Sequence, residues 1–312
     1  MTNRERFHKV MNGDNNIDCC PALEWAIWWD KTLMSWIEEG MPSNMGDKEL
    51  FDYFNLDDNV QFWFPHRTAN CPPEQFHGSG IITNEEDYER MKPFLYPEDA
   101  VTSMLNIIEQ TIPRYKSGET IVWYTLNGFF WFPRELFGIE NHMYAFYDYP
   151  KLYHRICNDL LEWQIGVLNE FAQYMKADFM TIAEDMSYNH GPMISENLFD
   201  EYMKPYYQML IPEIKKHGTR VFVDSDGNVE KAISWFVGAG VEGILPLERQ
   251  AGVDIEKIRM VWPDFLMLGG FDKMSMFKEK EDIQAEFERI LPVIRSGRYL
   301  PSMDHQTPPG VT

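Results

Sequence analysis

The stretch Thr-Arg-Val-Phe-Val-Asp-Ser-Asp-Gly-Asn, residues 219–228, is a short apolar run that ends in two carboxylates and a glycine. Side chains alternate faces along a strand, so a strand here directs Asp224 and Asp226 to the same side, and Gly227 permits an immediate turn. Residues 229–236 then have helical spacing. The pattern predicts a strand, an acidic loop and a helix, which is typical of α/β enzymes. A helix cap is the alternative role of Asp226.

The same pattern recurs along the chain, where short β-rich runs end in polar side chains and helical spacing follows. The predicted strands lie at residues 20–25, 59–65, 120–126, 178–183, 219–224, 243–247, 265–270 and 299–303. Eight strands that alternate with helices are typical of a closed parallel barrel. We therefore predict an α/β fold, a single TIM-type (β/α)8 barrel domain over residues 1–312. A short amphipathic helix at residues 1–11 forms its N-terminal helical extension.

Polar residues at the predicted strand ends are the candidates for a functional site, because such barrels place their sites at the carboxyl ends of the strands. In chain order these residues are Glu24, His66, Asn127, Asp185, Asp224, Asp226, Glu248, Asp272 and His305. Trp25 and Tyr188 lie beside these ends, and we expect both to bind substrate together with Glu24, His66 and Asn127. The alternatives are a helix cap for Asp185 and a packing role for His66.

Composition limits the partners of this protein. A formal net charge of -21 opposes binding to nucleic acid and to anionic membranes. The four cysteines contain no Cys-x-x-Cys pair, and no run of eighteen apolar residues occurs. The N-terminal residues lack the apolar core of a secretion signal. We therefore expect a cytoplasmic protein that acts on a small-molecule substrate.

Several motifs occur in the order seen in one known superfamily. They are Asp226-Gly-Asn228, Leu245-Pro-Leu-Glu248, Gly269-Gly-Phe-Asp272, and Gly297 to His305 with Pro308-Pro309. Through them the chain resembles the uroporphyrinogen decarboxylase superfamily, most strongly from residue 178 onward. The resemblance implies a (β/α) barrel and, together with the aromatic excess, a homodimer. It also implies a further helix beyond the Pro-Pro motif, after residue 312.

The superfamily includes the decarboxylase and corrinoid-dependent methyltransferases, and the decarboxylase pattern is incomplete here. The arginines that the decarboxylase carries after its first strand are replaced by Ala26-Ile-Trp-Trp-Asp30, and the aspartate after its second strand is replaced by Pro65-His66. Burying a substrate with many carboxylates without matching cations is costly. His305 does stand where the decarboxylase has a functional histidine. Decarboxylation of a porphyrinogen or another carboxylated substrate is therefore the second hypothesis.

The methyltransferase branch binds zinc at positions that correspond here to Asp224, Asp226, Glu248 and His305. Without sulfur ligands, this set suits a harder divalent ion or a zinc ion with bound water. The resemblance thus implies methyl transfer between a small molecule and a corrinoid on a partner protein, with Asp185 also catalytic. A metal-free rim in which Glu248 pairs with His305 is the alternative site, and a non-enzymatic small-molecule binder is the alternative function.

Overall fold

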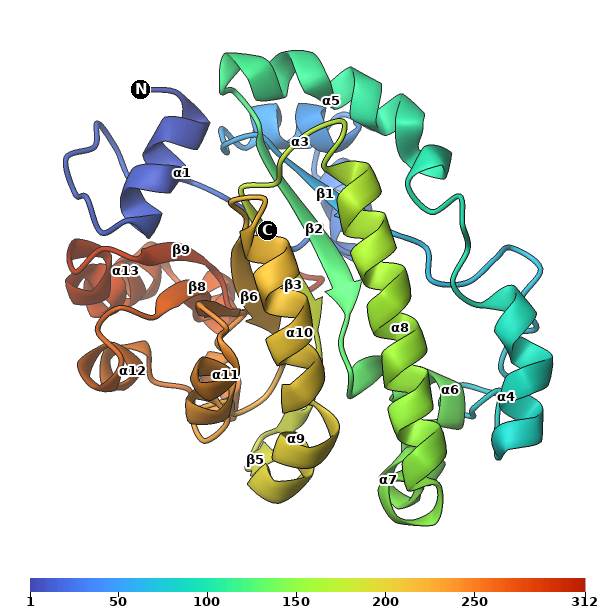
Figure 1. Ribbon diagram of the computed structural model, residues 1–312. Helices are drawn as coiled ribbons and strands as arrows, with labels where there is room; N and C mark the ends of the chain where they lie inside the picture. The colour runs from blue at the N-terminus through green and yellow to red at the C-terminus, as the bar shows by residue number, and fades with distance from the viewer. Residues whose placement is uncertain (312) are drawn as a thin grey trace.

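The computed structural model describes residues 1–311 and has a mixed α/β architecture around one curled parallel sheet (Figure 1). Its seven strands follow the order β1-β2-β3-β6-β7-β8-β9. Their bounds are β1 (Asn59–Trp63), β2 (Ile121–Asn127), β3 (Phe179–Ala183), β6 (Arg220–Asp224), β7 (Gly243–Leu245), β8 (Leu266–Phe271) and β9 (Tyr299–Met303). Every residue of β2, β3 and β8 is buried, as expected for a parallel sheet that is covered on both faces.

Helices follow most strands and cover the outer face of the sheet, where α8 and α10 run along it (Figure 1). The helices are α1 (Asn3–Met11), α2 (Asp30–Glu38), α3 (Asp47–Tyr53), α4 (Glu85–Met91), α5 (Leu105–Ser117), α6 (Trp131–Phe137), α7 (Ile139–Asp148), α8 (Pro150–Phe171), α9 (Glu196–Tyr202), α10 (Lys204–Lys215), α11 (Ile233–Ala239), α12 (Ile255–Val261) and α13 (Lys280–Arg295). Short 3-10 helices are η1 (Lys92–Phe94), η2 (Thr102–Met104), η3 (Arg249–Ala251) and η4 (Lys273–Phe277), and a small hairpin pairs β4 (Ser187–Tyr188) with β5 (Gly191–Pro192). No helix within residues 1–311 is long and apolar enough to cross a bilayer.

The predicted helix at residues 1–11 is confirmed as α1, and it closes the end of the sheet where the strands begin. Asp178, which directly precedes β3, accepts hydrogen bonds from the Arg4 guanidinium at 2.8 Å and pairs with His8 at 2.7 Å. Phe7 and Met11 are buried against apolar side chains from the inner face of the strands. The carboxyl ends of the strands are therefore the end that remains for a site.

The prediction of a strand at residues 20–25 is wrong, and the sheet has seven strands where eight were predicted. Pro21 lacks a backbone N–H. The Ala22 carbonyl accepts the Asp57 N–H at 2.9 Å just before β1, and the contacts to β1 and β9 themselves involve side chains. Asn59 of β1 donates a hydrogen bond to the Glu24 carbonyl at 3.0 Å, and Ser302 of β9 donates to the Glu24 carboxyl at 3.2 Å. The segment thus contacts both edge strands without forming a backbone ladder. The other seven predicted strands match β1, β2, β3, β6, β7, β8 and β9 to within a few residues.

Candidate functional site

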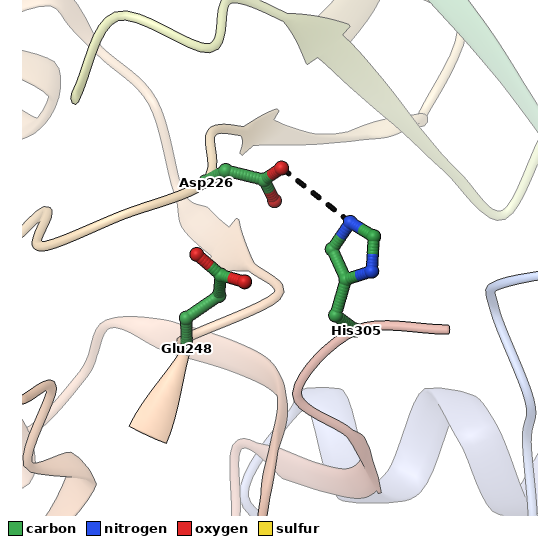
Figure 2. Close-up of side chains that lie close together, drawn as sticks. All are labelled: Asp226, Glu248 and His305. Atoms are coloured by element: carbon green, nitrogen blue, oxygen red, sulfur yellow. Dashed lines mark ion pairs between the residues drawn. The ribbon is translucent and has the colours of Figure 1, made fainter. Parts of the chain in front are cut away.

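Three polar side chains from three different strand ends meet at one point (Figure 2). Asp226 follows β6, Glu248 follows β7 and His305 follows β9. One nitrogen or oxygen atom of each lies within 4.8 Å of the others. His305 Nε2 lies 3.4 Å from Asp226 Oδ2, so the imidazole pairs with Asp226. The alternative pairing of His305 with Glu248 is therefore not the one that forms.

The turn at Gly227 makes this arrangement possible. Its φ of 79° lies in the left-handed region, and an added Cβ would lie 2.8 Å from the backbone of Tyr188. The Gly227 N–H donates to Glu248 Oε2 at 2.8 Å. The turn predicted at this glycine is therefore confirmed, and its backbone also orients the carboxylate from the next strand end.

A lysine that the sequence analysis missed holds the other oxygen of Glu248. Lys273, the first residue of η4, donates from Nζ to Glu248 Oε1 at 3.3 Å. Asp304 is fully buried beneath them and accepts the N–H groups of Arg249 at 2.8 Å and Lys273 at 3.1 Å. Because Asp304 immediately precedes His305, it ties together the three loops that carry Glu248, Lys273 and His305.

A second group of acids adjoins the first and shares Asp226. Carboxylate oxygens of Asp185, Asp224 and Asp226 lie within 4.8 Å of one another. Asp185 has a φ of 37°, unusual for a residue other than glycine, and its Oδ1 accepts the Asp226 N–H at 3.1 Å. Burial and the neighbouring Asp226 charge raise the pKa of Asp185 to about 6. Burial and the charges of Asp185 and Asp226 raise the pKa of Asp224 well above its usual range.

These acids line a cavity of about 270 Å³. Its lining residues are Trp25, Ala26, Ile27, Gln61, Trp63, Asp185, Asp224, Asp226, His305 and Gln306, and they include no lysine or arginine. The contact with the Asp226 carboxylate raises the pKa of His305 and favours its cationic form. A small molecule in this cavity therefore meets carboxyl groups, one imidazole and two indole rings.

The other predicted substrate-binding residues lie outside the lining of this cavity. His66 pairs with Glu135 at 3.0 Å, and Asn127 donates to the same carboxylate at 3.0 Å, so these groups satisfy one another beyond the end of β1. Glu24 faces Ser302, and burial raises its pKa to about 7. Tyr188 is half exposed on the β4 hairpin. Of the substrate-binding predictions, only Trp25 lines the cavity, and Asp224 lies in the second acid group and not with Glu248 and His305.

The cavity-lining residues that were missed are Ala26, Ile27, Gln61, Trp63 and Gln306. The signal that could have found Gln61 and Trp63 was their place in β1. Both lie on alternate positions of that strand, with their side chains on one face. Asp254 and Asp272 are caps, since each accepts backbone N–H groups at the start of a helix.

A parallel α/β sheet with acids and an imidazole gathered at the carboxyl ends of its strands defines an enzyme-like site. The family model for uroporphyrinogen decarboxylase (URO-D) matches residues 79–312. The chain therefore belongs to the uroporphyrinogen decarboxylase family. Members of that superfamily are enzymes, which supports an enzymatic function for this chain. No curated protein matches it.

Proposed function

We propose that this protein is a methyltransferase of the uroporphyrinogen decarboxylase family that transfers a methyl group between a small molecule and a corrinoid on a partner protein. The proposal rests on the convergence of Asp226, Glu248 and His305 within 4.8 Å. These positions correspond to zinc-binding positions in the methyltransferase branch that the sequence resembles. A divalent metal ion at this point is part of the proposal.

The charge of the cavity supports methyl transfer over decarboxylation of a porphyrinogen. Its lining contains three carboxyl groups and no lysine or arginine. A substrate with many carboxylates would be placed beside like charges, and each buried carboxylate would lack a partner. The nearby cations are already engaged, because Lys273 contacts Glu248, and Arg134 donates to the Asp185 carbonyl at 3.4 Å.

The donor set fits a divalent ion, since two carboxylates and one imidazole suit zinc with bound water or a harder ion. Asp226, Glu248 and His305 would hold it, and a bound ion supplies Lewis-acid polarisation of a substrate atom. When a methyl group leaves a substrate oxygen or nitrogen, that atom keeps the bonding electron pair and takes up a proton. Asp185 lines the same cavity and, with a pKa of about 6, can deliver that proton.

The cavity does not fit a corrinoid in its interior. A volume of about 270 Å³ suits a small molecule, and a tetrapyrrole macrocycle is far larger. In this proposal the corrinoid stays on its own protein and approaches from outside. Ile27 and Trp63 line the cavity and are both nearly half exposed, so they offer an apolar rim for that approach.

The same proposal includes a closed barrel. The Glu24 segment has contacts to both β1 and β9, which are the two edges of the sheet. In this arrangement the segment fills the eighth position without forming a strand, and it carries Trp25 to the cavity wall.

The test combines metal analysis with a methyl-transfer assay. The full chain, purified without a histidine tag or chelator, is expected to contain about one divalent ion, and Asp226→Asn and His305→Gln are expected to lose it. Asp264→Asn is the matched control, because that side chain is 85% exposed and lies outside the cavity lining. Methylation of cob(I)alamin, free or protein-bound, is then followed with a panel of methylated and methoxylated compounds.

Two outcomes would contradict the proposal. Failure of every compound to methylate cob(I)alamin, together with production of coproporphyrinogen from uroporphyrinogen, would assign a decarboxylase. Ligand binding that is unchanged in Asp226→Asn and His305→Gln, without turnover of any compound, would assign a non-enzymatic binder.

A further inference from the structure

We propose that Lys273 is a resident counter-ion of the metal site, which positions Glu248 in the metal-free protein and is displaced toward Asp304 when a divalent cation binds. This inference rests on the proposed metal site at Asp226, Glu248 and His305. It assigns a role to a side chain that belongs to neither acid group and does not line the cavity.

Each oxygen of Glu248 already accepts one hydrogen bond. Oε2 accepts the Gly227 N–H at 2.8 Å, and Oε1 accepts from Lys273 Nζ at 3.3 Å. The ammonium therefore lies at hydrogen-bond distance from one of the two carboxylate oxygens that a metal ion could approach. A divalent ion bound to Oε1 either shares that oxygen with the Lys273 ammonium or displaces the ammonium. Repulsion between the two cations favours displacement.

The competition between the Lys273 ammonium and a metal ion is strong because the pair of Lys273 and Glu248 is largely shielded from solvent. The Lys273 side chain is 15% exposed, and that of Glu248 is 18% exposed, so solvent screens the pair only in part. A lysine ammonium is a compact charge on a flexible four-carbon chain, which suits it to move while the backbone stays in place.

Asp304 provides the second position. Its side chain is fully buried, and its Oδ1 lies 4.0 Å from Lys273 Nζ. The backbone N–H groups of Lys273 and Arg249 hold the Asp304 carboxyl in place. When the ammonium leaves Glu248, it gains a closer ion pair with Asp304 and does not enter an uncompensated environment. Lys273 thus lies between two carboxylates, one that belongs to the proposed metal site and one that belongs to neither acid group.

The experiment measures binding of Zn²⁺ by titration calorimetry, and of Co²⁺ by visible absorption, to the chelator-treated full chain. Lys273→Met removes the charge and keeps the length of the side chain. We expect this variant to bind both ions at least about tenfold more tightly than the unaltered protein, the order of effect of one charge a few ångströms away in a partly buried site. Lys278→Met is the matched control, because Lys278 is exposed at the end of the same 3-10 helix, and its affinity is expected to be unchanged.

A second readout separates this role from simple structural support. Without metal, Lys273→Met is expected to unfold at a lower temperature, because Glu248 loses its partner, while Zn²⁺ raises its unfolding temperature more than that of the unaltered protein. Lys273→Gln provides the same test if the methionine variant folds poorly. Equal or weaker affinity in both variants would overturn the inference. If Asp226→Asn still abolishes binding in that case, the proposed metal site survives, whereas absence of binding in every protein overturns both.

Discussion

Replacing Glu184 by alanine is expected to destabilise the protein strongly, because this buried carboxylate holds the loop after β2. It accepts the backbone N–H groups of Phe129 at 2.9 Å, Phe130 at 2.8 Å and Trp131 at 3.1 Å, and it also accepts the hydroxyl of Tyr207. Each buried donor left without a partner costs about 1–3 kcal/mol. Three backbone donors therefore cost roughly 3 kcal/mol or more, a large share of the roughly 5–15 kcal/mol that stabilises a typical domain.

The assay is urea unfolding followed by circular dichroism, at a pH above the value of about 7 to which burial raises the pKa of Glu184, so that the group is ionised. Glu109→Ala, an exposed change on α5, is the control and is expected to shift stability by less than about 0.5 kcal/mol. The stability of Glu184→Gln is expected to lie between those of Glu184→Ala and the control. Its amide keeps one acceptor oxygen, but its NH2 group is a donor and faces backbone N–H groups that are donors too. A loss below about 1 kcal/mol in Glu184→Ala would refute the reasoning.

Three further predictions concern the groups that hold the site in place. Gly128→Ala puts a Cβ 2.1 Å from Cδ of Glu184 and should lower the free energy of unfolding by about 1–3 kcal/mol. Gly166→Ala, whose Cβ meets no atom within 4 Å beyond its chain neighbours and its own helix backbone, should be neutral or stabilising, and equal effects would contradict this. Burial raises the pKa of Glu24 from 4.5 to about 7, so the folded state binds its proton more tightly, and stability falls as pH rises between those values. Glu24→Gln should remove that part of the pH dependence of stability. If stability changes with pH equally in Glu24→Gln and in the unaltered protein, this prediction is wrong. Asp178→Asn weakens the pairing of Asp178 with Arg4 and His8 of α1 and should lower the free energy of unfolding by about 2–3 kcal/mol. It should also expose residues 1–11 to protease, and unchanged cleavage would show that Asp178 does not hold α1 in place.

Strand positions were predictable because burial imposes an apolar run on each parallel strand. All seven residues of β2 are buried, and the chain there contains no charged residue. The segment at residues 20–25 is equally apolar up to Glu24, yet side chains of Asn59 and Ser302 take the contacts that a backbone ladder would make. Periodicity reports which faces are buried, and it does not report whether a backbone or a side chain supplies the hydrogen bond.

The meeting of Asp226, Glu248 and His305 could be predicted for a topological reason. Carboxyl ends of neighbouring parallel strands lie at the same edge, so acids that end separate strands converge there whatever their separation in sequence. Lys273 could not be predicted in this way, because its partner Glu248 lies 25 positions earlier, and a lysine in a loop is usually solvated. The His66 prediction has the same weakness, because only the folded chain brings Glu135 to it.

The gathered acids repel one another, and most of them have a partner of their own that compensates the charge. Glu248 has Lys273, Asp226 has His305, and Asp304 has two backbone N–H groups. Asp185 accepts the Asp226 N–H, and its pKa rises only to about 6. Within residues 1–311 the Asp224 carboxyl accepts no hydrogen bond, and burial together with the charges of Asp185 and Asp226 raises its pKa well above its usual range. Burial and like charges favour the protonated form of such a carboxyl, which lowers the repulsion within the cluster. The groups that compensate the other acids lie one residue or one loop away from the acids that mark the site.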